Sequence, residues 1–326
     1  MQGFLRTLAV AGLVSASFMG QSVPGGAADK LTVAHSTWIG YGALYIAKEK
    51  GYFDEAGVDV ELKIIEASSD AIAAMQGGQI EASASSVDNF ALFSGNGAKL
   101  SVIMSLDESH GGDGIVAKKE IAELSDLKGR TVAVQKGSVS QFILSQALDK
   151  AGLQLADVNA IDMKSGDAGA AFVAGRVDAA VTWQPWLSKA AATDFGRILI
   201  DTSTMPGVVV DAIAVHPDYL KDHKKEVQAF VKAYYKGIDF LKADPAAGKE
   251  IIARNLKMTP DALEATWKDV RFFDRTDNAA FFGTGGDSAA KQLVKNAGEF
   301  YTRIGVLKKA PDADTVVNAG AELADE

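Results

Sequence analysis

The sequence of 326 residues contains no cysteine. Disulfide bonds, thiolate metal sites, iron–sulfur clusters, cysteine nucleophiles and a lipidated cysteine anchor are therefore excluded. Basic residues are also in deficit, with 33 Lys and Arg against 42 Asp and Glu and a formal net charge of −9. No basic block could neutralise a run of phosphates, so nucleic acid is not expected as a partner.

Signals for catalysis are missing as well. The four histidines, at positions 35, 110, 216 and 223, show no metal-ligand spacing. The sequence has no G-x-S-x-G, no H-E-x-x-H, no G-x-x-x-x-G-K-[ST] and no complete G-x-G-x-x-G. We therefore expect no catalytic residue, no metal and no cofactor. The function must rest on oxygen, nitrogen and aromatic groups.

Long hydrophobic runs are absent after residue 28, where no stretch approaches the ~18 residues that a membrane span needs. Residues 1–28 place one cation, Arg6, before an apolar run from Leu8 to Met19, and a Pro/Gly break and small residues follow. This layout is typical of a secretory signal, with cleavage near Ala28, and a buried N-terminal helix is the alternative. The remaining chain is then expected in the periplasm.

What the sequence does contain is the material of a globular α/β protein. Hydrophobic residues make up 48% of the chain, and its length suggests about two domains. From residue 29 to about 216, short apolar runs such as LTVAHS, TVAVQ and VVVDAIAV alternate with helix-like segments. This alternation predicts α/β layers with largely parallel sheets, and the chain from about Pro217 onward is predicted to be helical.

An internal repeat indicates how the chain is divided into structural units. Residues 32–34 and 131–133 are both Thr-Val-Ala, and the acid-led segment 70–82 is echoed by residues 167–179. Chance matching in Ala- and Gly-rich sequence is the alternative, but the order of elements agrees in both copies. Two similar α/β units would bring equivalent strand-end loops to the edges of two sheets, where open α/β folds bind ligands. We therefore expect facing lobes that share one cleft.

Several segments together carry a resemblance to a known family: LYIAKEKGYFDEAGVDVEL, a Gly-x-Ile-Glu-Ala strand, SDLKGRTVAVQKGS and GRVDAAVTWQPW. From about residue 30 to 240 the chain resembles periplasmic substrate-binding proteins of ABC importers, in the taurine, aliphatic-sulfonate and nitrate branch. The resemblance implies a type II binding-protein fold, with two α/β lobes joined by two crossing segments near residues 113–117 and 209–214. Lobe one would comprise residues 29–114 and 213–326, and lobe two residues 115–212.

Candidate ligand-binding residues lie at the predicted strand ends and crossings. They are the aromatic residues Trp38, Tyr41, Trp183 and Trp186, the serines Ser86, Ser138 and Ser140, and the acids Asp88, Asp107, Asp113 and Asp211. The tryptophans would form an aromatic wall against a planar or cationic group, and core packing is the alternative. Ser138 and Ser140 precede a helix whose free N–H groups could face an anion, or they could simply cap it.

The acids favour an amine-bearing ligand. Asp211 interrupts the apolar run 208–215, and burying a carboxylate without a partner is expensive. A ligand cation is the expected partner, and a hinge carboxylate bonded to backbone N–H groups is the alternative. In the taurine branch, the resemblance implies that this position receives the ligand amine. Asp113 stands among glycines and could equally be a turn residue.

We therefore expect a monomeric extracytoplasmic protein that delivers a small polar solute to the membrane permease of an ABC transporter. The solute would be an amine-bearing zwitterion such as a taurine-like sulfonate, or a small organic cation. Two alternatives remain open. One is an enzyme on the same fold, resembling pyrimidine-biosynthesis enzymes, and the other is a sensor for the same class of ligand.

Overall fold

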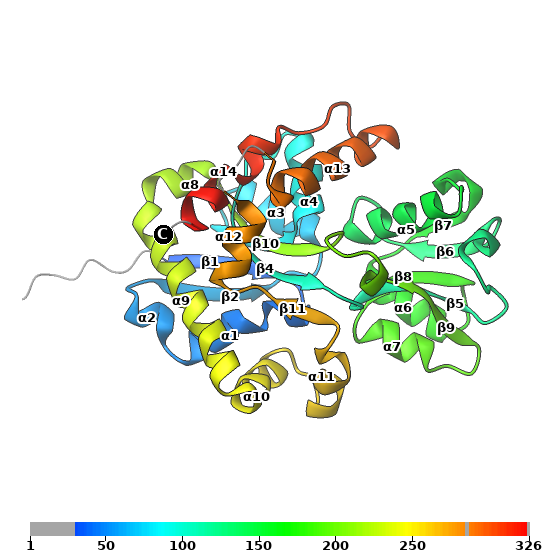
Figure 1. Ribbon diagram of the computed structural model, residues 1–326, viewed down its shortest axis with the longest axis horizontal. Helices are drawn as coiled ribbons and strands as arrows, with labels where there is room; N and C mark the ends of the chain where they lie inside the picture. Colours follow the sequence, from blue (N-terminus) through cyan, green and yellow to red (C-terminus); the bar gives the residue numbers. More distant parts are fainter. Residues whose placement is uncertain (1–29, 284–286, 325–326) are drawn as a thin grey trace, which may run out of the picture.

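The computed structural model describes residues 30–283 and 287–324, so the predicted signal segment lies outside the described residues. The strands form two separate sheets, seen left and right in Figure 1. The six-stranded sheet has the order β11-β4-β10-β3-β1-β2 and the five-stranded sheet the order β7-β6-β8-β5-β9. The first contains β1 (Lys30–His35), β2 (Asp59–Ile64), β3 (Ala82–Ser86), β4 (Ser101–Ser109), β10 (Val210–Val215) and β11 (Val270–Phe272). The second contains β5 (Asp113–Lys118), β6 (Thr131–Val134), β7 (Asn159–Asp162), β8 (Ala179–Trp183) and β9 (Gly196–Asp201).

The register of the strands confirms the internal repeat. In the first sheet Val33 of β1 pairs with Ala82 of β3, and in the second Val132 of β6 pairs with Ala179 of β8, each pair running parallel. These are the positions that the sequence repeat equates. Three strands of each sheet are therefore parallel, namely β2-β1-β3 and β7-β6-β8.

The expectation of largely parallel sheets was wrong for the remaining strands. β10 is antiparallel to both β3 and β4, β4 is antiparallel to β11, and β5 is antiparallel to both β8 and β9. The antiparallel direction of β5 and β10 follows from the path of the chain. The chain enters each sheet from the other one through these two strands, so they run in the opposite direction to the strands of the βαβ units.

The passages between the sheets are short. The chain leaves β4 at Ser109 and joins the second sheet at Asp113, and it leaves β9 at Asp201 and returns to the first sheet at Val210. These passages precede the predicted crossings at residues 113–117 and 209–214 by a few residues. Two hydrogen bonds tie the first passage down: Ser109 N–H donates to the Val209 carbonyl (3.0 Å), and His110 N–H donates to the Asp269 carbonyl (2.8 Å).

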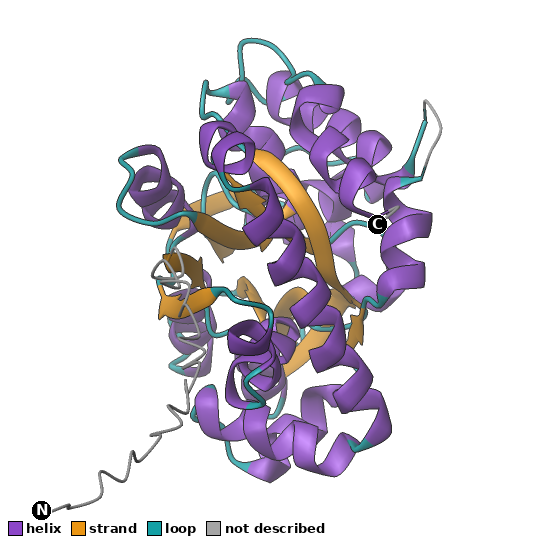
Figure 2. Cartoon of the chain, turned by 90° about the vertical axis from the view of Figure 1, so that its left-hand side faces the viewer, coloured by secondary structure: helices purple, strands orange, loops and turns teal. Residues whose placement is uncertain are grey.

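Helices pack on both faces of each sheet, and Figure 2 shows the helices seen from the side of the first sheet. Those of the first sheet are α1 (Gly42–Glu49), α2 (Tyr52–Glu55), α3 (Ser68–Gln76), α4 (Val87–Gly95), α8 (Pro217–Asp222), α9 (Lys224–Ala243), α10 (Pro245–Asn255), α11 (Pro260–Trp267), α12 (Arg275–Phe282), α13 (Ala289–Arg303) and α14 (Ala313–Ala324). Those of the second are α5 (Val139–Lys150), α6 (Ser165–Val173) and α7 (Trp186–Ala191). Short 3-10 turns are η1 (Ile39–Tyr41), η2 (Leu124–Leu127), η3 (Leu155–Asp157) and η4 (Thr202–Thr204). The helical run predicted after residue 216 thus matches α8 to α14, and β11 is the one strand among the described residues of this range.

Alternation along the strands divides the hydrophobic core into layers. Ile115 and Ala117 of β5 pack into one buried cluster of the second sheet, and Val116 packs into the other. Successive side chains of a strand point to opposite faces, so one apolar run serves both layers. No helix among the described residues is long and apolar enough to span a membrane.

Candidate binding site

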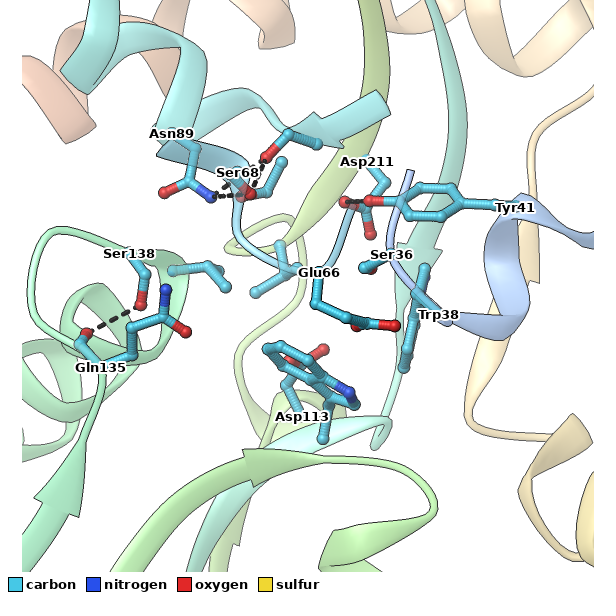
Figure 3. Close-up of a pocket in the computed structure, with 15 residues that line it drawn as sticks. Ser36, Trp38, Tyr41, Glu66, Ser68, Asn89, Asp113, Gln135, Ser138 and Asp211 are labelled. Atoms are coloured by element: carbon cyan, nitrogen blue, oxygen red, sulfur yellow. Dashed lines mark hydrogen bonds between the residues drawn. The ribbon is translucent and has the colours of Figure 1, made fainter. Parts of the chain in front are cut away.

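A polar pocket lies where the two sheets face each other (Figure 3). Its volume is about 50 Å³, several times the ~10–15 Å³ that one water molecule requires. The pocket therefore fits a small solute. Its lining comes from both sheets and comprises Ser36, Trp38, Tyr41, Glu66, Ser68, Ser85, Ser86, Asn89, Asp113, Gln135, Ser138, Val139, Trp183, Val209 and Asp211.

Asp211 enters the pocket from the first sheet. It is the second residue of β10 and pairs with Ser86 on one side and Asp107 on the other. The Tyr41 hydroxyl donates a hydrogen bond of 2.8 Å to Asp211 Oδ1. The expected ligand cation would share Asp211 with this side-chain donor, and none of the hydrogen bonds to the Asp211 carboxylate in the described residues comes from the backbone N–H groups of the hinge alternative. Among the hydrogen bonds of the described residues, none reaches Oδ2, so this oxygen is left for a ligand.

Asp113 enters the pocket from the second sheet. It is the first residue of β5, it pairs with Trp183 at the end of β8, and only 5% of it is exposed. Trp183 is half-buried and packs against the hydrophobic core of the first sheet. The indole of Trp183 therefore reaches across from the second sheet and closes one wall of the pocket.

Trp38 forms a second aromatic wall and is held by its surroundings. Its indole N–H donates a hydrogen bond of 2.9 Å to Asp107 Oδ1. Two glycines make room for this arrangement. A Cβ at Gly40 would lie 2.1 Å from Asp107 Oδ2, and a Cβ at Gly112 would lie 2.3 Å from the Trp38 ring. Asp107 thus positions the ring without lining the pocket itself.

The charged side chains of the lining are all acids: Glu66, Asp113 and Asp211. Burial raises the pKa of Asp113 to about 7, and the nearby Asp88 carboxylate adds to the shift. Burial, together with the neighbouring carboxylates of Asp107 and Asp113, also raises the pKa of Asp211 well above its usual range. Without a cation in the pocket, burial and mutual repulsion therefore disfavour the ionised forms of Asp113 and Asp211. A positively charged ligand would stabilise the ionised carboxylates and lower both pKa values again.

The opposite end of the pocket is polar but uncharged. In Figure 3, Asp211, Tyr41 and Trp38 lie together, while Gln135 and Ser138 lie across the pocket from them. The Ser138 hydroxyl caps α5 by accepting a hydrogen bond from Ser140 N–H (3.2 Å), and it donates to the Gln135 carbonyl (2.8 Å). The capping alternative thus holds for Ser138, although the residue also lines the pocket.

Two buried polar atoms of this lining have no partner among the described residues. They are Ser86 Oγ and Asn89 Oδ1, and each residue is 3% exposed. The Asn89 amide nitrogen is already used, since it donates to Ser85 Oγ at 3.1 Å. Buried polar atoms are rarely left unbonded, so both atoms are available to a ligand.

Seven of the eleven predicted residues line the pocket: Trp38, Tyr41, Ser86, Asp113, Ser138, Trp183 and Asp211. Asp88, Asp107, Ser140 and Trp186 lie outside the lining, and we no longer expect them to touch a ligand. The Tyr301 hydroxyl donates to Asp88 Oδ2 (3.0 Å), and Ser140 Oγ is bonded to Ser165 Oγ (2.7 Å). Burial raises the pKa of Asp88 to about 6.

Trp186 lies outside the pocket because it is the first residue of α7, whereas Trp183 is the last residue of β8. Its ring lies against α6, where a Cβ at Gly169 would come 2.7 Å from Trp186 Cβ. The Lys189 ammonium sits 4.8 Å from the centre of the ring. Trp186 is therefore a packing residue of the second sheet's helical layer.

The prediction missed several lining residues. Glu66 and Ser68 follow β2 and were not considered, although the carboxyl end of β2 lies at the same edge as the ends of β1 and β3. The other missed residues are Ser36, Ser85, Asn89, Gln135, Val139 and Val209, which stand in or beside the strand-end loops that the sequence analysis used. Among the described residues, no group of three or more His, Asp or Glu side chains is arranged to hold a metal ion.

Comparison with known proteins places this geometry in a family. Residues 38–248 match the family described as NMT1/THI5 like. The chain belongs to the NMT1/THI5 like family. A Brucella abortus protein that carries the provisional name of a binding protein is 26% identical over 235 residues, covering 69% of this chain and 70% of the relative. The taurine-binding periplasmic protein of Escherichia coli is 22% identical over 231 residues, covering 70% of this chain and 69% of the relative.

Solved structures confirm the fold of this family member. The alkanesulfonate-binding protein of Xanthomonas axonopodis pv. citri, solved with MOPS bound, superposes with a TM-score of 0.74 at 20% identity, covering 89% of this chain and 99% of that one. The predicted two-lobed binding-protein fold and the predicted resemblance to taurine- and sulfonate-binding proteins are thereby confirmed. At this identity the likeness establishes the fold and not the ligand.

Enzymes share the fold as well. A desulfurization enzyme superposes with a TM-score of 0.65 at 18% identity, covering 91% of this chain and 98% of the enzyme. The fold alone therefore does not decide between binding and catalysis. The two curated relatives described above are named binding proteins.

Proposed function

We propose that this chain is an extracytoplasmic solute-binding protein that delivers a small amine-bearing compound to the permease of an ABC importer. The observation that carries the proposal is the charge of the pocket. Its charged lining residues are three acids, and Trp38 and Trp183 add two aromatic walls. Aromatic faces and carboxylates both attract cations.

The location and the delivery role rest on relatives and on the sequence. The Escherichia coli relative is named a periplasmic protein, and a relative from Brachyspira hyodysenteriae has a name that places it with an ABC transporter. Residues 1–28 have the layout of a secretory signal. We propose that the chain acts as a monomer whose two lobes meet near residues 110–112 and 202–209 and close over the solute.

An amine-bearing zwitterion and a small organic cation both meet this description. A purely anionic solute does not, because its charge would face Asp113 and Asp211. The N-terminus of α5 could receive an anionic end of a zwitterion, since Ser138 and Val139 line the pocket there.

Thermal denaturation of the mature protein with a panel of amines, guanidines, taurine, alkanesulfonates and carboxylates tests the proposal. A ligand present at 100 times its Kd stabilises the folded state by about 2.7 kcal/mol, which raises Tm measurably. We expect stabilisation by amine-bearing compounds. Stabilisation by alkanesulfonates or carboxylates without an amine would contradict the proposal.

The competing enzymatic reading is tested with the same ligands. After prolonged incubation with the protein, the compound is recovered and analysed by mass spectrometry. A binding protein returns its ligand unchanged. Conversion of the compound at a rate proportional to protein concentration would show catalysis.

A further inference from the structure

The internal repeat makes Asp113 and Asp211 counterparts of each other. Ser86 is the last residue of β3 and Trp183 is the last residue of β8, and the repeat equates these two strands. Asp211 on the antiparallel β10 pairs with Ser86, and Asp113 on the antiparallel β5 pairs with Trp183. Each sheet thus presents one carboxyl group, at the start of its entering strand, to the same pocket.

Both carboxyl groups are buried, at 6% exposure for Asp211 and 5% for Asp113. Acidic groups alone do not define a ligand, but the surrounding atoms add information. Ser86 Oγ and Asn89 Oδ1 are buried, unpartnered and part of the lining. The carboxylates of the two aspartates and the amide oxygen of Asn89 therefore accept hydrogen bonds. The Ser86 hydroxyl can either accept or donate one.

No Lys or Arg lies in the lining to satisfy these acceptors. The missing partner must be small, because the pocket volume is about 50 Å³. It must carry N–H donors in more than one direction, because the two carboxyl groups arrive from opposite sheets. The ligand must also be able to lie against the aromatic faces of Trp38 and Trp183.

We propose that Asp113 and Asp211 jointly bind a compact planar cation of the guanidinium or amidinium class, with N–H groups directed at a carboxylate from each lobe. The proposal rests on the proposed function and narrows its ligand. A guanidinium has five or more N–H donors in one plane, pairs with carboxylates through two parallel hydrogen bonds, and stacks on aromatic rings.

Other cations meet fewer of these conditions. A quaternary ammonium would contact the indoles but has no N–H for either carboxylate. A primary ammonium is a point charge with three donors on one atom, so one carboxylate could satisfy most of its hydrogen bonds. A taurine-like zwitterion could place its sulfonate at the N-terminus of α5, but its ammonium is a single point charge that pairs with one of the two carboxylates.

Isothermal titration with four probes tests this inference: methylguanidine, methylamine, tetramethylammonium and taurine. The proteins are the wild type, Asp113→Asn and Asp211→Asn. Asp239→Asn serves as the control, because Asp239 is exposed on α9 and the substitution changes the net charge equally. Asparagine keeps the shape of the side chain, and circular dichroism and Tm check that each variant is folded.

We expect methylguanidine to bind the wild type most tightly of the four. Each pocket variant should weaken it about 30-fold or more, as when one member of a buried charge pair is removed. Asp239→Asn should leave the affinity within about twofold, since an exposed charge contributes little.

The outcomes separate the inference from the proposed function. If methylamine or taurine binds and depends on Asp211 but not on Asp113, the amine-binding function stands and the two-carboxylate inference is wrong. Equal or tighter binding of tetramethylammonium would also overturn the inference, because that cation has no N–H donor. If none of the four probes binds, or if binding is insensitive to both pocket variants, both proposals fail.

Discussion

At the scale of single residues, the site depends on two tryptophans that look alike in sequence and differ in place. Trp183 ends β8 and lines the pocket, and Trp186 begins α7 and packs on α6. We expect Trp183→Ala to weaken binding of a cationic ligand by about 1–2 kcal/mol, the contribution of a desolvated cation–π contact.

Trp186→Ala is the matched control for this change. It should leave the affinity nearly unchanged and lower the free energy of unfolding by about 2 kcal/mol or more, because it removes a packed indole. Titration calorimetry and urea denaturation of both variants measure the two effects. A loss of affinity in Trp186→Ala without a loss in Trp183→Ala would reverse the assignment of the two rings.

The same comparison shows what the sequence could tell at this scale. Asp211 was predictable because an acid within an apolar strand requires a partner, whereas the glycines around Asp113 made a turn residue an equal alternative there. The Tyr41 hydroxyl that bonds Asp211 lies 170 positions away in the chain, and such a partner has no local signal. Glu66 and Ser68 could have been found by treating the end of β2 like the ends of its neighbours.

At the scale of elements, the Tyr301 side chain of α13 links the two lobes near the pocket. Its hydroxyl contacts Asp88 Oδ2 on α4 (3.0 Å) and the Ser138 carbonyl at the start of α5 (3.3 Å). Tyr301→Phe leaves these buried acceptors without this donor. We expect the free energy of unfolding to fall by about 1–3 kcal/mol.

Tyr235→Phe is the control for this substitution. Tyr235 is also buried, but its hydroxyl makes no hydrogen bond among the described residues, so its removal should change stability by less than about 0.5 kcal/mol. Urea denaturation of both variants measures the difference. Equal stability of the two variants would show that the Tyr301 hydroxyl does not link α4, α5 and α13 as described.

The elements themselves were largely predictable. Thr-Val-Ala at residues 32–34 and 131–133 marked equivalent strands, and their pairing partners agree in both sheets. The antiparallel direction of β5 and β10 was not predictable from periodicity, because both are apolar runs like their parallel neighbours. Their direction follows from the passage between sheets, which is a property of the whole chain. The placement of the lobe boundaries remains a proposal.

At the scale of the whole molecule, the buried acids make stability depend on pH. The pKa of Asp88 is raised to about 6 and that of Asp113 to about 7, against about 3.9 for an unfolded aspartate. The folded state therefore binds more protons than the unfolded state between these values, so these groups lower stability as pH rises from about 4 to about 7. His35 acts in the opposite sense, since burial lowers its pKa.

We expect the acids to outweigh this single histidine, so the ligand-free protein should have a higher Tm at about pH 5.5 than at about pH 8. Asp113→Asn removes one of the titrating groups and should reduce the difference, as should a bound cation. Differential scanning calorimetry at the two pH values measures it. A ligand-free protein that is more stable at the higher pH would contradict this electrostatic description.

Closure of the lobes is the second expectation at this scale. Gln184 of the second lobe donates a hydrogen bond of 3.0 Å to Asp269 Oδ2 beside the first passage, so the two lobes already touch there. We expect a tight ligand to reduce the radius of gyration through rotation about residues 110–112 and 202–209. Scattering curves that superimpose with and without a saturating ligand would argue against hinge closure.

In this description of the molecule, the pocket between the sheets holds a cation against Asp211. A crystal structure of the protein with its tightest ligand would show this contact directly. We expect a ligand nitrogen within hydrogen-bonding distance of Asp211 Oδ2, with the ligand lying against the Trp38 or Trp183 ring. A sulfonate or carboxylate group of the ligand beside Asp211, or a ligand bound outside this pocket, would contradict it.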